Sequence, residues 1–469
     1  AEEGTTIDVR GGQDVILGGL VVAGGALTES GVDWAGPDSD VNLYAGEQLD
    51  LSTGVLASRN VTIETGTPGA DDQDLSFRLQ TDGGITARGV TSDGSGGEVR
   101  ILSAGNIEVQ GGILSGGTSR DDIITWGEEP SNIFIEAAGR AWIGGTTVDS
   151  NNDPVEVGGR LLANQRIDVI GGTHPDGAGV RLPGSAQLVT YRPNSIISIE
   201  SDQDAIVNSI LAAGGEVIQE QDADGKLKGA IVESFDGNSE ILIAAGHQIR
   251  LGREITAGAR IDIRGGEDPV TGSGDPYEGV GLVLLGSARL LTIQENSEIN
   301  IGGTGDVLML HDPFNYQLRA SDFPEFVSGR LTQDVTLEME FDPGTGFEGA
   351  SIVITAASTA DNSGRLDLAE DIESAIAAAL TDEVGVTTQD GRLLFRSDFE
   401  FRFLQTSVNA DLLGLAELVD RNLAGTKAYG VDAPERGSIV NFFSEGTNGG
   451  VFTLAGKVRG YEGVTFTSA

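Results

Sequence analysis

Residues 45–63 read AGEQLDLSTGVLASRNVTI, and the motif that opens this stretch recurs twelve residues later as ASRNVTI. The same shift of twelve separates AGHQIRL at 245–251 from AGARIDI at 257–263, and a looser copy, AGNIEV, lies at 104–109. Each copy places a small-residue pair before two apolar residues in alternation, so both apolar side chains face one side of a strand. Short strand units repeating at a short period are typical of β-solenoids. The stretch therefore predicts a coil of short strands and favours a structural or adhesive role over catalysis.

The composition limits the partners that this chain of 469 residues can have. Its formal net charge is −43, which argues against nucleic acid as a partner and against adsorption to anionic membranes, because both need basic clusters. Cations are expected to screen so acidic a surface. We expect no membrane insertion, since no apolar run reaches the length that spans a bilayer. The absence of cysteine excludes disulfides and thiolate metal sites.

Residues 1–310 are predicted to form the body of the solenoid. Short alternating phrases such as Ile7-Asp8-Val9 recur throughout, and the 70 glycines of the chain read as turns between them. The twelve-residue shift is either half of a coil or two sides of a three-sided coil, and both interpretations are open at this point. Polar stretches that lack alternation are expected to be loops extruded from the coil, and residues 214–233 are expected to form a hairpin.

The sequence period changes in residues 311–430, where we predict an inserted α+β module. Residues 335–339 and 350–354 alternate like strands. A helix is predicted over 368–380, because apolar side chains recur there at every fourth position. A second helix is expected over 410–423, and its inward positions are Leu412, Leu415, Val419 and Leu423.

In residues 431–469 the short alternating pattern of β-strands returns, which predicts a further part of the solenoid. The chain starts and stops in such phrases without a polar cap at either end. Because an open coil exposes unpaired backbone and apolar core, we expect either a longer chain or a subunit that stacks end to end.

Two parts of the chain resemble known bacterial proteins. SGRLDLAEDIESAI at 363–376, GRLLF at 391–395 and LGL at 413–415 follow an order that resembles the β-α-β-β motif of flagellin, hook-associated proteins and giant repeat-bearing surface proteins. The usual Ile-Asn pair near the helix centre is absent, so flagellar assembly is not implied. The AGxxIxIxGG phrasing of residues 1–310 resembles the right-handed parallel β-helix of filamentous-haemagglutinin-type adhesins. Together these resemblances imply a segment of a giant bacterial surface protein.

Calcium is the one metal ion for which the sequence offers candidate ligands, in two segments with alternating oxygen-bearing side chains. The candidates are Asp149, Asn151 and Asp153 in the first segment and Asp222 and Asp224 in the second. Neither segment completes an EF-hand, because Pro154 stands at the glycine position of the first and no closing glutamate follows in either. An Asp-rich solvated turn is the competing interpretation of each segment, although the net charge favours weak Ca²⁺ binding somewhere on the surface.

The case for an enzyme is weaker. Right-handed β-helices include polysaccharide lyases and hydrolases, which gather acids or a basic residue on one groove across successive coils. Trp34, Trp126 and Trp142 could stack on sugars or anchor the core, and the three isolated histidines form no metal-binding pair. We therefore expect no enzyme, and polysaccharide degradation remains the alternative function.

The sequence as a whole predicts a mainly β protein, a right-handed parallel β-helix with an inserted small α+β domain. Its expected function is that of a structural segment of a large secreted bacterial surface protein, located outside the cell or on its surface. It would form a stiff rod or filament for spacing, adhesion, matrix or polymer assembly by stacking β coils. The expected partners are copies or neighbouring repeats of the same chain, and extracellular glycans.

Overall fold

The fold is known from a computed structural model, which is mainly β, with 56% strand and 6% helix. It describes residues 4–28, 31–34, 36–68, 75–120, 123–148, 154–221, 227–235, 237–266, 277, 279–286, 288–310, 316–320, 324, 328–342, 348–362, 364–380, 384–389, 392–397, 399–421, 426–427, 431–445, 451–455 and 457–468.

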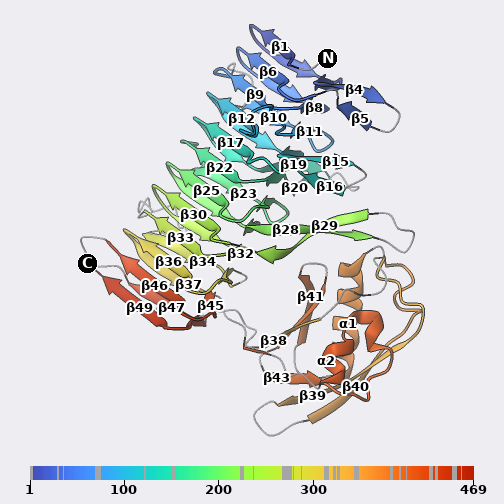
Figure 1. The fold of residues 1–469 in the computed structure, drawn as a ribbon. Coiled ribbons are helices and arrows are strands. Elements are labelled where there is room, and N and C mark those ends of the chain that lie inside the picture. Colours follow the sequence, from blue (N-terminus) through green and yellow to red (C-terminus); the bar gives the residue numbers. More distant parts are fainter. Residues whose placement is uncertain are drawn as a thin grey trace. The chain divides into compact units, whose positions relative to one another are not determined.

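Three long parallel sheets make up most of the described chain (Figure 1). Sheet A has twelve strands, in the spatial order β1 (Thr6–Gly11), β6 (Asp40–Ala45), β9 (Val61–Thr65), β12 (Glu98–Ser103), β17 (Asn132–Ala137), β22 (Arg166–Gly171), β25 (Ile196–Ser201), β30 (Glu240–Ala245), β33 (Arg260–Gly265), β36 (Glu298–Gly303), β46 (Ile439–Ser444) and β49 (Gly463–Ser468). Sheet B has eleven, β2 (Val15–Leu17), β7 (Leu49–Leu51), β10 (Leu75–Leu79), β13 (Asn106–Val109), β18 (Ala141–Trp142), β23 (Ala178–Leu182), β26 (Asp204–Val207), β31 (Ile249–Leu251), β34 (Val280–Leu284), β37 (Asp306–Met309) and β47 (Phe452–Leu454). Sheet C also has eleven, β3 (Val21–Ala23), β8 (Gly54–Ala57), β11 (Gly84–Ala87), β14 (Gly112–Ser115), β21 (Arg160–Ala163), β24 (Gln187–Thr190), β27 (Ile210–Ala213), β32 (Glu254–Ala257), β35 (Arg289–Thr292), β45 (Val431–Ala433) and β48 (Val458–Gly460).

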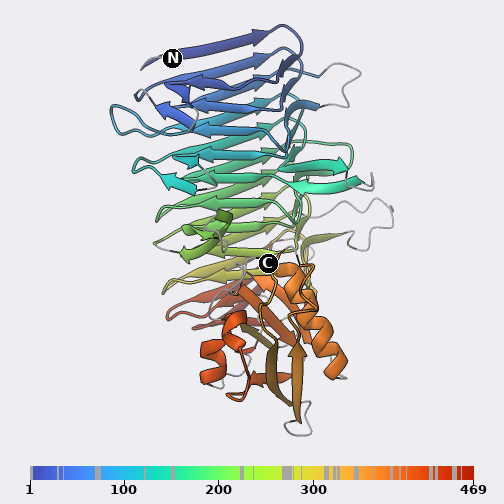
Figure 2. The ribbon, with the colours of Figure 1, turned by 90° about the vertical axis from the view of Figure 1, so that its right-hand side faces the viewer.

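The chain visits sheets A, B and C in turn, and we call one such circuit a coil (Figure 2). The repeated motif of residues 45–63 now has a definite place. Ala45, which opens the first copy, ends β6 in sheet A, and Ala57, which opens the second, ends β8 in sheet C, so the step from one to the other covers β7 and β8. The twelve-residue shift is therefore two sides of a three-sided coil. The arrangement is compatible with the β-solenoid that the sequence predicts.

Apolar side chains that point inward form continuous columns along the coils. In sheet A, one column joins register partners from ten successive strands, each at most 1% exposed: Leu43, Ile63, Ile101, Ile135, Val169, Ile199, Ile243, Ile263, Ile301 and Phe442. Burying each such side chain stabilises the fold by about 1.5–3 kcal/mol. The alternation in the sequence thus becomes one core shared by neighbouring coils.

The Ala45-Gly46 pair of the motif forms the corner between sheets A and B, whereas the Ala57-Ser58 pair of the second copy forms the corner between sheets C and A. The Gly46 main-chain N–H donates to Gly11 O at 3.0 Å, in the preceding coil. A Cβ on Gly46 would lie 2.1 Å from Gly12 O, and one on Gly66 would lie 2.0 Å from Gly46 O. These corners therefore accept glycine because adjacent coils approach too closely for any side chain.

Buried serines directly precede six of the twelve strands of sheet A: Ser39, Ser131, Ser195, Ser239, Ser297 and Ser438. Ser297 and Ser438 come directly before β36 and β46 and are at most 1% exposed. Ser297 Oγ lies 2.8 Å from Ser438 Oγ and 2.8 Å from Thr292 Oγ1. These hydroxyl groups hydrogen-bond from coil to coil where the chain turns from sheet C to sheet A, so their burial is compensated.

Four antiparallel hairpins depart from the coils: β4 (Gly25–Thr28) with β5 (Gly31–Trp34), β15 (Gly117–Arg120) with β16 (Ile123–Trp126), β19 (Gly144–Val148) with β20 (Pro154–Gly158), and β28 (Gly215–Gln221) with β29 (Leu227–Phe235). The last of these lies in the segment where the sequence predicts a hairpin, residues 214–233. The second and third hairpins overlap residues 118–131 and 146–154, two of the polar stretches that the sequence predicts to be extruded loops.

The chain divides into two compact units, and the second comprises residues 218–233 and 312–429. Its larger part holds a four-stranded and a three-stranded antiparallel sheet. In chain order the elements are β38 (Tyr316–Arg319), β39 (Val335–Asp342), β40 (Glu348–Ile354), α1 (Arg365–Ala379), β41 (Val384–Gln389), β42 (Arg392–Ser397), β43 (Glu400–Phe403), the 3₁₀ turn η1 (Ala410–Leu413), α2 (Ala416–Asp420) and β44 (Thr426–Lys427). Helix α1 buries Leu368, Ile372 and Ile376 in the core of this unit.

The expected helix over 410–423 is wrong in its extent. A 3₁₀ turn occupies Ala410–Leu413, and a separate five-residue helix occupies Ala416–Asp420. Gly414 between them is left-handed, with φ of 72°, which ends the first turn before the second helix begins.

No described helix is long and apolar enough to cross a membrane.

Candidate functional site

The expected Ca²⁺ ligands, Asp149, Asn151, Asp153, Asp222 and Asp224, all lie outside the described residues, so calcium binding by them stays a prediction. Within the described ranges, no group of three or more histidines or acids is arranged to hold a metal ion. Another part of the molecule gathers polar side chains.

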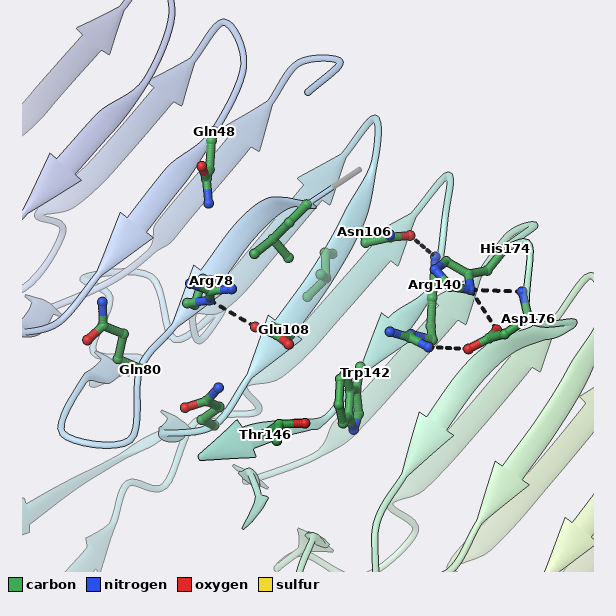
Figure 3. A pocket seen from close by; sticks show the side chains of 13 residues that line it. Gln48, Arg78, Gln80, Asn106, Glu108, Arg140, Trp142, Thr146, His174 and Asp176 are labelled. Carbon is green, nitrogen blue, oxygen red and sulfur yellow. Dashed lines mark hydrogen bonds and ion pairs between the residues drawn. The ribbon is translucent and has the colours of Figure 1, made fainter. Parts of the chain in front are cut away.

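A groove of about 930 Å³ crosses the outer face of sheet B (Figure 3). It is lined by Gln48, Leu75, Arg78, Gln80, Asn106, Ile107, Glu108, Gln110, Arg140, Trp142, Thr146, His174 and Asp176. All of these residues belong to the unit that contains the three parallel sheets. We call this site the sheet B groove.

Strand register aligns an outward column of side chains across the groove. Asp50 pairs with Arg78, Arg78 with Glu108, Glu108 with Trp142, and Trp142 with Arg181, one residue from each of five successive coils. Their strand neighbours point into the core, because side chains alternate between the two faces of a sheet. The column therefore follows from the same alternation that builds the core.

Hydrogen bonds link this column along the groove. Arg78 Nε donates to Glu108 Oε2 at 2.8 Å, and Gln80 Nε2 donates to Asp50 Oδ1 at 2.7 Å. Each bond joins adjacent coils. Both carboxylates are thus already engaged by donors of the protein.

Trp142 is held beneath two arginines. The guanidinium carbon of Arg140 lies 4.7 Å from a Trp142 ring centroid, and that of Arg181 lies 5.5 Å away. Such cation–π contacts are worth about 0.5–2 kcal/mol, more where water is excluded. Because Trp142 is only 9% exposed, it offers little ring surface on which a sugar could stack.

The other two tryptophans are also engaged. Trp126 stacks on Tyr191 with ring centroids 5.1 Å apart and planes 4° from parallel. Arg88 lies over Trp34, 5.8 Å from its centroid. The sequence left open whether the tryptophans stack on sugars or anchor the core. These contacts are those of anchoring aromatics.

His174, Asp176 and Arg140 form a cluster at one end of the groove. His174 Nδ1 lies 2.6 Å from Asp176 Oδ1, and Arg140 Nη1 donates to Asp176 Oδ2. The Arg140 main-chain N–H donates to Asn106 Oδ1 at 2.7 Å. Figure 3 shows the side chains of His174 and Arg140 both directed at Asp176.

The environment of the cluster shifts two pKa values downward. Burial by itself would raise the pKa of Asp176, but the Ala178 amide, His174 and Arg140 together outweigh it and lower that pKa. Burial lowers the pKa of Arg140, and the nearby Asp176 opposes this effect. Asp176 is therefore held as a carboxylate and paired with a cation.

Two donors in the wall of the groove have no hydrogen-bond partner among the described residues. They are Arg140 Nε and Trp142 Nε1, and both atoms are buried. An unsatisfied buried donor destabilises a fold by about 1–3 kcal/mol.

Sequence reasoning missed the sheet B groove. Each of its residues is unremarkable in its own segment, and Arg78, Glu108 and Trp142 are separated by inserted loops of different length. The signal that could have found them is the outward position in each strand of sheet B, which requires the register between coils. Of the residues in the groove, the sequence singled out only Trp142, as an aromatic, and His174, as one of three isolated histidines, although Asp176 follows His174 two positions later.

The groove can form many hydrogen bonds, and its carboxylates Glu108 and Asp176 are both paired with arginine. Searches against protein families, curated proteins and solved structures find no match to this chain.

Proposed function

We propose that this chain is a structural segment of a large secreted bacterial surface protein, in which a right-handed parallel β-helix forms a stiff extracellular rod. The observation that carries the proposal is the continuity of the three parallel sheets, of twelve, eleven and eleven strands. Parallel crossovers are nearly always right-handed, which supports that hand for the coil. With strands about 4.8 Å apart, eleven coils extend over about 50 Å.

Stacking of further coils is the proposed mode of assembly. Strands β1 and β49 each pair with only one strand among the described residues, so each has a second edge available for pairing. Phe466 in β49 is the register partner of the fully buried Phe442, yet it is 53% exposed. A neighbouring repeat or a second copy would cover it in the way that each coil covers the one before.

The test is assembly of the purified chain as a function of concentration, by sedimentation and electron microscopy. We expect end-to-end rods, and we expect Phe466→Asp to suppress them. The matched control is Val353→Asp, which alters a 52% exposed residue in β40 of the second unit. Equal assembly of both variants, or a wild-type chain that stays single at all concentrations, would contradict end-to-end stacking.

Polysaccharide degradation is the competing function. Glycoside hydrolases of the common type need one carboxylic acid and one free carboxylate at the scissile bond. In the sheet B groove, Glu108 and Asp176 are both paired with arginines, which supports a role other than hydrolysis. Release of reducing ends or unsaturated products from a polysaccharide panel would reverse this preference.

A further inference from the structure

The sheet B groove has the shape and chemistry of a binding site, and we propose that it binds a neutral, hydroxyl-rich polysaccharide chain. The groove lies along the side of the coils, so this binding and the proposed stacking at the end coils can succeed or fail separately. Four properties of the groove carry the inference: its length, its charge balance, its hydrogen-bonding groups and its unsatisfied donors.

The groove is long enough for several residues of a polymer. Its lining comes from five successive coils: Gln48 precedes β7, Arg78 lies in β10, Glu108 in β13, Trp142 in β18, and Asp176 precedes β23. With adjacent strands about 4.8 Å apart, this run extends over about 19 Å. An extended chain therefore fits the groove better than a single small molecule does.

Most charges in and beside the groove cancel in pairs, although the whole chain carries −43. Asp50 is the exception, because its hydrogen-bond partner is the neutral Gln80 side chain. The pairs are Arg78 with Glu108, Arg140 with Asp176, and Arg181 with Glu156. An anionic polymer would meet arginines that are already neutralised, and the field of the whole protein would repel it. A neutral ligand pays no such electrostatic penalty.

The lining offers both donors and acceptors, as hydroxyl groups require. Gln48, Gln80, Asn106 and Gln110 contribute carboxamides, each with a C=O acceptor and two N–H donors. Gln80 Nε2, Asn106 Oδ1 and Gln110 Oε1 each hold one protein partner, which leaves further donor and acceptor positions on these groups. Figure 3 shows Gln48, Gln80 and Asn106 spread along the groove rather than gathered at one point. Among the described residues, no hydrogen bond engages the Gln48 side chain, which lines the groove. A polyhydroxylated chain can use such groups in series.

The burial of the Trp142 ring favours recognition of the polysaccharide by hydrogen bonds over recognition by stacking. Its ring lies beneath Arg140 and Arg181, and it is 9% exposed. The buried donors Arg140 Nε and Trp142 Nε1, which lack partners among the described residues, leave hydrogen-bonding capacity in the same wall. A ligand oxygen that reached either donor after a small side-chain shift would gain a bond that the protein does not make itself.

The experiment is affinity gel electrophoresis of the full chain through gels that contain one soluble polysaccharide each. The neutral probes are dextran, xyloglucan and galactomannan, and the charged probe is polygalacturonate. We expect retardation by at least one neutral probe and weaker retardation by polygalacturonate. Gln48→Ala and Gln110→Ala should each weaken that retardation about 2- to 12-fold, the effect of one lost hydrogen bond. The control is Gln187→Ala in β24 of sheet C, outside the groove, which should bind like the wild type.

Several results would overturn the proposal. They are an absence of retardation by all three neutral probes, tighter binding of polygalacturonate than of any neutral probe, and an equal loss of binding in Gln48→Ala and Gln187→Ala. Circular dichroism of each variant must match the wild type, so that a loss of binding is assigned to the groove. Trp142→Phe provides a second variant, because it keeps an aromatic ring and removes the Nε1 donor together with the five-membered ring of the indole.

Discussion

The guanidinium carbon of Arg100 lies 4.4 Å from the ring centroid of Phe134, and the two residues are register partners in β12 and β17. Arg10 and Tyr44, partners in β1 and β6, repeat this arrangement at 4.7 Å. Both pairs lie on the outer face of sheet A. Neighbouring coils are thus joined by cation–π contacts outside the core as well as by apolar columns inside it.

The Arg100–Phe134 contact should be measurable by a double-mutant cycle. We expect a coupling free energy of about 0.5–1 kcal/mol between Arg100→Ala and Phe134→Leu, as for exposed cation–π pairs. The measurement is urea unfolding of the wild type, both single variants and the double variant. Additive effects of the two substitutions would show that the contact contributes nothing.

Removing one residue from the inward column should destabilise the parallel sheets strongly. Ile101 is fully buried, so Ile101→Ala should lower the free energy of unfolding by about 2–5 kcal/mol. Thr62→Ala, at an outward position in β9, is the control and should change it by less than about 0.5 kcal/mol. Similar effects of both substitutions in urea unfolding would contradict the assignment of the two faces.

The pH dependence of stability should include a contribution from Glu98. Burial, more than any other effect, raises the pKa of Glu98, Asp168 raises it further, and Arg100 opposes both. The folded state therefore favours the protonated acid, and the associated stability is lost as pH rises through the raised pKa. Glu98→Gln should stabilise the protein near neutral pH, by less than about 1 kcal/mol because the side chain is 37% exposed and solvent screens it.

The same substitution provides its own control at low pH. Below the usual glutamate pKa of about 4.3, the acid is protonated in both the folded and unfolded states, so the gain from Glu98→Gln should vanish. The measurement is urea unfolding of both proteins over a series of pH values. If the stabilisation by Glu98→Gln persists unchanged at acidic pH, it arises from packing rather than from charge.

The second unit should unfold as a separate transition when it is weakened. Ile372 of helix α1 is fully buried in the core of that unit, and Ile372→Ala should destabilise it by about 2–5 kcal/mol. We expect calorimetry to show one shifted and one unshifted transition, because the two units have separate hydrophobic cores. A single transition that shifts as a whole would show that the units unfold together.

Cations should stabilise the protein because its charge of −43 repels itself. The melting temperature is expected to rise with sodium chloride, and the expected Ca²⁺ sites predict a further rise with calcium at equal ionic strength. Asp149→Asn with Asp153→Asn should remove part of that further rise. Identical melting in calcium and magnesium would argue against a calcium site.

Much of the architecture could be read from the chain. The inward alternation of Leu49 and Leu51, and the glycine of the Ala45-Gly46 pair, are local signals that correspond to a strand and a corner. The apolar spacing of Leu368, Ile372 and Ile376 placed helix α1, although the structure starts it at Arg365. The helix expected over 410–423 was the weaker prediction, because the left-handed Gly414 divides a segment whose apolar pattern is continuous.

By itself, then, the sequence determined which side chains face inward and where the coils turn. It also determined where the apolar period changes to that of an α+β module. All three features depend on neighbours within a few residues along the chain. Only the tertiary structure decided that the coil has three sides, that buried serines align between coils, and that Arg78, Glu108 and Trp142 share one groove. The physical reason is register: Val41 pairs with Val61, but Ile299 pairs with Val440, so the spacing between partners varies with every insertion. Side chains that meet across coils are therefore set by strand pairing, which the local pattern does not encode.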